Sequence, residues 1–240
     1  MAAGKECVSE SYPMSSGDGQ HSYSQNSTFQ KKGVEAAKEM VNTAVQEMLE
    51  FNNNIEISKT LFCIADFGCS VGPNTLIAVQ NITQAVRLKH YNISQNHPPL
   101  EFQVFFNDHT HNDFNTLFKN LSFSPPGEFF AAGVPGDFHS RLFPRESLHL
   151  GHSSYALHWL SRAPGEVMDV DSPAWNGNSI HCTGFSRQVA NAYLAQFHKD
   201  MEDFLNARAQ ELVGGGLMLL MIPGLKRWVP LLSNYYGYQL

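Results

Sequence analysis

Cysteine is scarce in this sequence, whose 240 residues include four, at positions 7, 63, 69 and 182. No two of them form a Cys-x-x-Cys pair, so the sequence indicates neither a zinc site nor a disulfide framework. Long apolar runs are absent too, because none approaches the roughly 18 residues that predict a membrane span. The polar N-terminus also lacks an apolar signal-peptide core. These absences predict a cytoplasmic protein that does not contact membranes.

Charge is limited as well. Charged residues make up 16% of the chain and the formal net charge is -6. An acidic balance gives no general attraction to nucleic acid or to anionic membranes. The hydrophobic content of 42% is typical of an ordered globular protein. The length suits one sizeable α/β domain, or one domain with a partial second.

The first part of the chain combines an irregular arm with a helix. Residues 1–30 are rich in Ser, Gly, Gln and Asn, which predicts an arm with little regular structure. Apolar residues at three-and-four spacing then predict a helix over 34–50.

Strand and helix patterns alternate along the rest of the chain. Five short apolar runs predict strands at 61–66, 101–107, 128–133, 146–150 and 217–222. Helical spacing appears at about 75–88 and at 186–213, where three glycines, 214–216, are expected to end the second helix. The run at 217–222 is apolar without alternation, as in a strand buried on both faces. The pattern predicts an α/β fold with a mostly parallel sheet covered on both faces.

The stretch Asp-Phe-Gly-Cys-Ser-Val-Gly-Pro-Asn-Thr at 66–75 directly follows the first predicted strand. Parallel open sheets bind ligands at the carboxyl ends of their strands, and Gly68 and Gly72 permit a tight turn with close backbone approach. Thr75 begins a helix whose amide end can face a polar ligand. The stretch is neither a P-loop nor a complete G-x-G-x-x-G fingerprint. A plain strand-to-helix turn is the alternative.

The second predicted strand also ends in an acid, Asp108. A carboxylate there can accept hydrogen bonds from both hydroxyls of a ribose. The alternative is an N-cap for the segment 112–114. No Lys or Arg accompanies the glycine loop, so an adenosine moiety with little phosphate is favoured. S-adenosylmethionine fits this description better than NAD or ATP.

Several ordered motifs resemble the plant SABATH methyltransferases, which include salicylate, benzoate, jasmonate and loganate carboxyl methyltransferases and the caffeine-pathway N-methyltransferases. The motifs lie at 14–19, 22–27 with Gln30, 66–75, 106–108 with 112–115, 133–138, 141–144 and 152–161. The resemblance covers about 13–224. It implies a Rossmann-like class I methyltransferase sheet and transfer of a methyl group from S-adenosylmethionine to a small plant acid.

The resemblance also implies site residues. The cofactor would be bound by Tyr23, Ser27, Asp66, Asn74, Asp108, His109, Asp137 and Phe138. Asp137 departs from the family's Ser at that position. The acceptor acid would be bound by Gln30, Tyr155, His158 and Trp159. Asn176 aligns with one residue of the family's Mg²⁺ site. The family also implies a homodimer.

The chemistry requires no general base, because a carboxylic acid with a pKa near about 4 is already anionic at neutral pH. Catalysis then consists of holding one oxygen in line with the sulfonium methyl group in a dry pocket. The Gln30 amide and the Trp159 indole N–H can donate to the acceptor carboxylate. Taken singly, Trp159 also fits a core aromatic residue, and His158 fits a packed or surface histidine.

The motifs divide the chain into an arm at 1–32, an incomplete methyltransferase domain at 33–225 and an atypical tail at 226–240. Family members add two final strands and a helical cap over the acceptor pocket, so the sequence predicts a C-terminally truncated chain. The alternative to an active carboxyl methyltransferase is an inactive fragment. Such a fragment would bind the cofactor at most, or would pair with an intact homologue.

Overall fold

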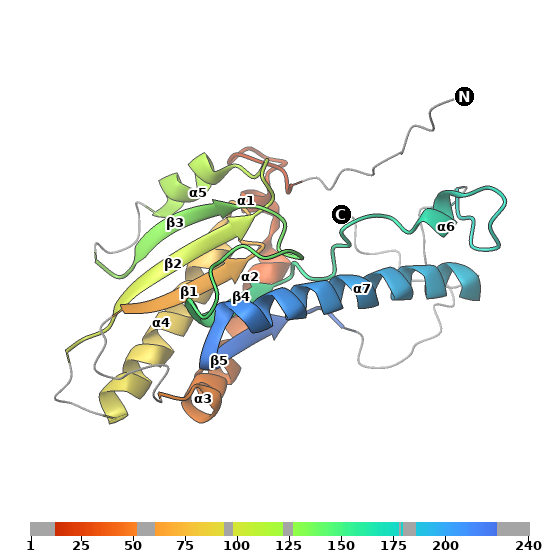
Figure 1. The fold of residues 1–240 in the computed structure, drawn as a ribbon. Coiled ribbons are helices and arrows are strands. Elements are labelled where there is room, and N and C mark those ends of the chain that lie inside the picture. The colour runs from red at the N-terminus through yellow and green to blue at the C-terminus, as the bar shows by residue number, and fades with distance from the viewer. Residues whose placement is uncertain are drawn as a thin grey trace.

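A parallel five-stranded sheet forms the centre of the molecule (Figure 1). The computed structural model describes residues 13–51, 61–93, 98–121, 127–177, 179 and 186–224. Every neighbouring pair is parallel, in the order β3-β2-β1-β4-β5. The strands are β1 (Leu61–Phe67), β2 (Glu101–Asp108), β3 (Phe130–Pro135), β4 (Leu148–Ser154) and β5 (Leu212–Met221). The predicted α/β fold with its parallel sheet is confirmed.

Helices cover both faces of this sheet. The described helices are α1 (Tyr23–Asn26), α2 (Thr28–Ala36), α3 (Lys38–Met48), α4 (Pro73–Ile93), α5 (Phe114–Leu121), α6 (Gly165–Met168) and α7 (Arg187–Glu211). The helices α3, α4 and α5 lie on one face and α7 lies on the other (Figure 1). Among the described residues, no helix is both long and apolar enough to cross a membrane.

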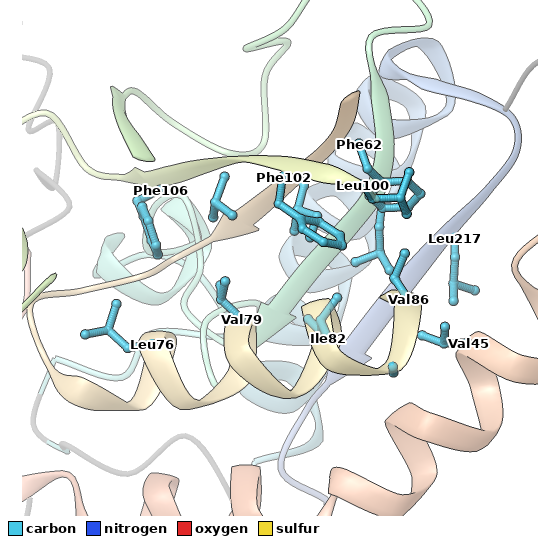
Figure 2. Close-up of a cluster of buried hydrophobic side chains, with 14 of the residues drawn as sticks. Val45, Phe62, Leu76, Val79, Ile82, Val86, Leu100, Phe102, Phe106 and Leu217 are labelled. Atoms are coloured by element: carbon cyan, nitrogen blue, oxygen red, sulfur yellow. The ribbon is translucent and has the colours of Figure 1, made fainter. Parts of the chain in front are cut away.

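The larger core lies between the sheet and α4 (Figure 2). Val79, Ile82 and Val86 follow helical spacing along α4 and are at most 1% exposed. They face Phe62 of β1 and Phe102 of β2, which point to the same side of the sheet. Burying each such side chain contributes about 1.5–3 kcal/mol relative to leaving it in water.

The second core lies under α7. Ala65 and Phe67 point to this face because side chains alternate along β1. Phe67 packs edge-on against Phe143 and against Phe204 of α7, with ring centroids 6.0 and 5.8 Å apart. Residues at both faces of β1 are therefore buried, as expected for a central parallel strand.

The predicted helix over 34–50 is wrong in its extent. The chain is already helical from Tyr23, and a turn at Ala37 separates α2 from α3. The Ala37 N–H donates to the Gly33 carbonyl at 3.0 Å, which closes the last turn of α2. Apolar spacing continues through this turn, so periodicity does not reveal it. The expectation of little regular structure up to residue 30 is wrong from Tyr23 onward, where α1 and α2 begin; residues 1–12 lie outside the described residues.

The glycines at 214–216 do not end α7, as the sequence suggested. The helix ends at Glu211, and the glycines lie inside β5. Leu148 pairs with Leu212, whereas Leu150 pairs with Leu217, so β5 carries extra residues at this point and forms a bulge. Gly215 has a φ of 86°, which favours glycine in the bulged strand. The predicted tail at 226–240 lies outside the described residues.

Candidate cofactor and substrate site

The site lies where the carboxyl ends of β1, β2 and β4 meet. The chain leaves β1 toward β2 on one side, whereas β4 lies on the other side of β1, so this edge is a topological switch point. Gly68 turns the chain with a φ of 82°. The N–H groups of Gly68 and Cys69 both donate to the Asn107 carbonyl, at 2.9 and 3.0 Å. The loop after β1 is therefore fixed to the end of β2.

A solvent-open cavity lies at this edge, with about 300 Å³ of empty space when the part open to solvent is included. It brings together five of the residues predicted from the sequence. These are Tyr23, Gln30, Asp66, Asn74 and Tyr155. Three further polar residues, Thr75, His152 and Ser154, also line it, and no lysine or arginine is among the described lining residues.

Asp66 lies at the centre of a buried polar group. Its side chain is 3% exposed and that of His152 is 4% exposed. Asp66 Oδ1 lies 2.6 Å from His152 Nδ1, and Asp66 Oδ2 accepts a hydrogen bond from the Thr75 hydroxyl. Sequence reasoning missed the roles of His152 and Thr75. The signal for His152 was its position near the carboxyl end of β4, where it is followed by two serines.

Asp108 ends β2 beside the same loop. Its Oδ2 accepts from the Ser70 N–H and its Oδ1 from the His109 N–H, both at 2.7 Å. Burial raises the pKa of Asp108, although these two hydrogen bonds oppose the shift. The alternative role as an N-cap is wrong, because Asp113 caps α5 by accepting from the Thr116 N–H at 3.0 Å.

The N-terminal helices α1 and α2 close one side of the cavity. The Asn74 amide donates to the Ser27 carbonyl at 3.2 Å and contacts the Tyr23 hydroxyl at 3.5 Å. The Tyr23 ring lies against Gly72, where an added Cβ would be 3.1 Å from the ring. Burial raises the pKa of the Tyr23 hydroxyl, so it remains protonated at neutral pH.

Several buried polar atoms at this edge have no hydrogen-bond partner in the protein. Gln30 Oε1 and Asn74 Oδ1 belong to residues that line the cavity, and Ser70 Oγ lies in the loop after β1. Buried polar atoms are nearly always paired with protein or ligand groups or with ordered water. These atoms therefore mark the places where a polar ligand can bind.

Tyr155 lines the cavity beside α2. It follows β4 with a φ of 55°, an uncommon value for a residue with a side chain, and its N–H donates to the Met221 carbonyl at 2.9 Å. Its hydroxyl lies so close to α2 that a Cβ added at Gly33 would be 2.0 Å away. Its ring meets Phe29 edge-on, with centroids 5.8 Å apart.

His158 and Trp159 do not line this cavity. Trp159 is 53% exposed, so the core-aromatic alternative is wrong. Its backbone N–H donates to the Ala156 carbonyl at 3.0 Å, and its ring centroid lies 5.7 Å from that of His158. Partial desolvation lowers the pKa of the His158 imidazole, although the residue remains exposed. The structure thus separates these two residues from the cavity that contains Gln30 and Tyr155.

Asp137 and Phe138 lie in the loop after β3. The Asp137 carboxylate accepts from the His139 N–H at 2.9 Å and lies 2.8 Å from its Nδ1. The hydrogen bond from the His139 ring is the main cause of the lowered pKa of Asp137. Phe138 packs edge-on against Phe204 of α7, with centroids 6.1 Å apart. The Asp137 carboxylate is therefore engaged within its own loop.

Within the described residues, neither His109 nor Asn176 belongs to a cluster of metal-ligating side chains. The rings of His109 and His111 stack with centroids 5.3 Å apart beside Asp108. The Asn176 side-chain amide donates to the Ser179 carbonyl at 3.4 Å. Within the described part of the chain, no three His, Cys, Asp or Glu side chains gather closely enough to hold a metal ion. The described residues around Asn176 thus do not assemble the carboxylate-rich set that Mg²⁺ prefers.

A comparison with known families decides the affiliation of the chain. The sequence profile described as "SAM dependent carboxyl methyltransferase" matches residues 9–238. The chain belongs to this family. The resemblance seen in the motifs is confirmed, and the match also includes most of the tail after Gly224, where the motifs show no family pattern.

Three relatives place the chain within the carboxyl methyltransferase family. It is 54% identical over 217 residues to loganic acid O-methyltransferase of Catharanthus roseus, covering 90% of this chain and 57% of that protein. It is 50% identical over 215 residues to farnesoic acid carboxyl-O-methyltransferase of Arabidopsis thaliana, covering 89% and 59%. The solved structure of loganic acid methyltransferase with SAH matches with a TM-score of 0.84 and 51% identity, covering 91% and 60%.

The chain spans only part of the length of these carboxyl methyltransferases. Its matches cover 57% of the loganic acid enzyme and 64% of a probable S-adenosylmethionine-dependent methyltransferase of Arabidopsis thaliana, At5g38780. The matches therefore show the family and the fold of this chain.

Proposed function

We propose that this chain binds S-adenosylmethionine at the carboxyl ends of β1 and β2 and transfers its methyl group to a small carboxylic acid, giving a methyl ester. The observation that carries the proposal is the cavity that Gln30 and Tyr155 share with Asp66 and Asn74. It combines the residues expected for the acceptor with those expected for the cofactor. Loganic and farnesoic acids, the acids named for two relatives, are the first acceptors to test.

The residues present fit an adenosine-containing cation. Asp66 and Asp108 supply carboxylate oxygens, and Asn74 and Ser70 supply unpaired polar atoms at the same loop. No cationic side chain competes with a positively charged ligand among the described residues of the cavity wall. The cofactor supplies an electrophilic methyl group on a sulfonium. The chain supplies the binding surface and the orientation.

The acceptor is expected to need positioning rather than activation. A carboxylate is already anionic at neutral pH, so no residue has to remove a proton. The Gln30 amide can donate to one oxygen of the acceptor, which leaves the other oxygen free to attack the methyl carbon. The Tyr155 ring excludes water from the same wall. Most of the rate enhancement would come from holding the two reactants at contact distance.

Removing the donor on Gln30 tests the acceptor site. We expect Gln30→Ala to lower kcat/KM by about 10- to 100-fold, because a hydrogen bond to a charged group contributes about 1.5–3 kcal/mol. The value of kcat/KM is measured from the transfer of a radiolabelled methyl group from S-adenosylmethionine to each of a panel of small acids. Trp159→Phe tests the indole donor, and Met40→Ala, at a 74% exposed position on α3, is the matched control. Unchanged kcat/KM in both site variants would contradict the assignment.

Acid should weaken cofactor binding through Asp108. Burial raises its pKa above the ordinary 3.8, so the carboxylate protonates at a higher pH than most aspartates do. The protonated form accepts hydrogen bonds from ribose hydroxyls less well, so affinity should fall as the pH is lowered through the raised pKa. The stability of the fold should change in the opposite direction. Because the pKa of Asp108 is higher in the folded state than in the unfolded state, protonation of Asp108 stabilises the fold. This stabilisation is complete below pH 3.8, the ordinary pKa of the unfolded state, and is lost as the pH rises through the raised pKa of the folded state.

Calorimetric titration with S-adenosylmethionine over a pH series measures the change in affinity, and thermal unfolding measures the change in stability. Asp108→Asn is the control, because an amide cannot ionise. Its affinity should be weak and should not vary with pH in the acidic range. A wild-type affinity that stays constant down to about pH 4 would contradict this role for Asp108.

A second candidate is a chain that binds the cofactor without transferring the methyl group, alone or paired with an intact homologue. The observation that favours it is the position of Trp159, which is 53% exposed and does not line the cavity. This candidate predicts a calorimetric signal with S-adenosylmethionine and no methyl ester with any acid. The methyl-transfer assay separates the two candidates.

Three further expectations remain predictions. Size-exclusion chromatography with light scattering tests the homodimer. Equilibrium dialysis with Mg²⁺ tests a magnesium site at Asn176. Imaging of a fluorescent fusion in plant cells tests the cytoplasmic location.

A further inference from the structure

His152 has no role in the function proposed above, yet it is one of the most deeply buried polar side chains at the site. Its residue is 3% exposed, and it lies on β4, directly beside Asp66 of β1 in the register of the sheet. Its Nδ1 is 2.6 Å from Asp66 Oδ1, and the Thr75 hydroxyl donates to the other carboxylate oxygen. Each oxygen of Asp66 is therefore held from a different element.

This arrangement fixes the orientation of the Asp66 carboxylate. His152 of β4 holds one of its oxygens and Thr75 of α4 holds the other, so the side chain is kept at the wall of the cavity. No lysine or arginine among the described lining residues of the cavity neutralises Asp66. A cationic group of the ligand would therefore meet no competing lysine or arginine at Asp66.

We propose that His152 is a positioning residue for the cofactor. By donating from Nδ1 it keeps the Asp66 carboxylate aimed into the cavity, where Asp66 binds a cationic group of S-adenosylmethionine. The inference rests on the proposed function, because it needs that cofactor in this cavity. S-adenosylmethionine carries two cations, the sulfonium and the α-ammonium, and either one offers the required chemistry.

The test compares three ligands by calorimetry on the full chain. S-adenosylmethionine has both cations, S-adenosylhomocysteine has the ammonium alone, and 5′-methylthioadenosine has neither. We expect His152→Leu to weaken S-adenosylmethionine binding about tenfold and 5′-methylthioadenosine binding less than about twofold. His152→Gln keeps a donor and should stay within about threefold of the wild type.

The outcomes separate the possible failures. If S-adenosylhomocysteine binding weakens as much as S-adenosylmethionine binding, Asp66 binds the ammonium; if it is spared, Asp66 binds the sulfonium. Equal losses for all three ligands would show a purely structural role and overturn the inference alone. A wild-type chain that binds none of the three overturns the proposed function as well. Thr75→Val, which removes the other donor, gives the same test should His152→Leu not fold.

Discussion

Replacing Glu211 with leucine is expected to lower the free energy of unfolding by about 3–5 kcal/mol, one of the largest effects of a single substitution in this chain. Glu211 and Arg208 form an ion pair at the end of α7, with Arg208 Nε 2.8 Å from Glu211 Oε2. Their side chains are 0% and 1% exposed. Removing one partner leaves the other charge buried and uncompensated, which costs more than the pair itself contributes.

The pair also holds the loop after β3 onto α7. Arg208 donates to the carbonyls of Phe138 and Ser140, at 2.7 and 2.8 Å. Glu211 Oε1 accepts from the N–H groups of Leu142 and Phe143, at 2.6 and 3.0 Å. Burial lowers the pKa of Arg208, and the hydrogen bond with Glu211 opposes that shift. The loop carries the predicted cofactor residue Phe138. Losing Glu211 therefore removes two of the hydrogen bonds that hold this loop in place.

Urea unfolding followed by circular dichroism measures this loss. Lys199→Ala is the control, because it breaks an exposed ion pair with Asp203 on the same helix, for which about 1 kcal/mol or less is expected. The double variant Arg208→Met/Glu211→Leu should recover part of the loss, since it removes both buried charges. A Glu211→Leu variant no less stable than Lys199→Ala would show that the pair is dispensable.

The sheet was predictable because each buried strand is a short apolar run between turn-forming residues. Every predicted strand overlaps an observed one, although β5 begins five residues earlier than the predicted 217. What apolar spacing cannot show is a turn inside a continuous pattern, as at Ala37 between α2 and α3. It also cannot distinguish glycines that end a helix from glycines that form a bulge, because both uses depend on positive φ.

The site was predictable where a rule of the fold places residues. Strand-end acids in a parallel sheet must lie at one edge, so Asp66 and Asp108 could be assigned there from the sequence. The partner of Asp66 could not, because His152 reaches it from β4, 86 residues further along the chain. A histidine in a strand is also a common core residue. The exposure of Trp159 depends on packing, which no local pattern records.

Adding one methyl group at Gly68 is expected to destabilise the chain by about 2–5 kcal/mol and to disturb the loop after β1. Gly68 has a φ of 82°, and an added Cβ would lie 2.2 Å from the Cβ of Ala156, which follows β4. The positive φ contributes about 1–2 kcal/mol of this cost, and the clash contributes about 1–3 kcal/mol. Because this loop carries the groups proposed to bind the cofactor, S-adenosylmethionine affinity should fall along with stability.

Two matched variants separate the conformational cost from the clash. Gly127 has a φ of 81° and nothing within 4 Å of an added Cβ, so Gly127→Ala should show the conformational cost alone, about 1–2 kcal/mol. Ala156→Gly in the Gly68→Ala background removes the methyl group that clashes, and should recover the difference between the two single variants. Urea unfolding of all four proteins gives the energies. If Gly68→Ala cost no more than Gly127→Ala, the ends of β1 and β4 would not meet as closely as the structure has them, and the cavity between them would have a different shape.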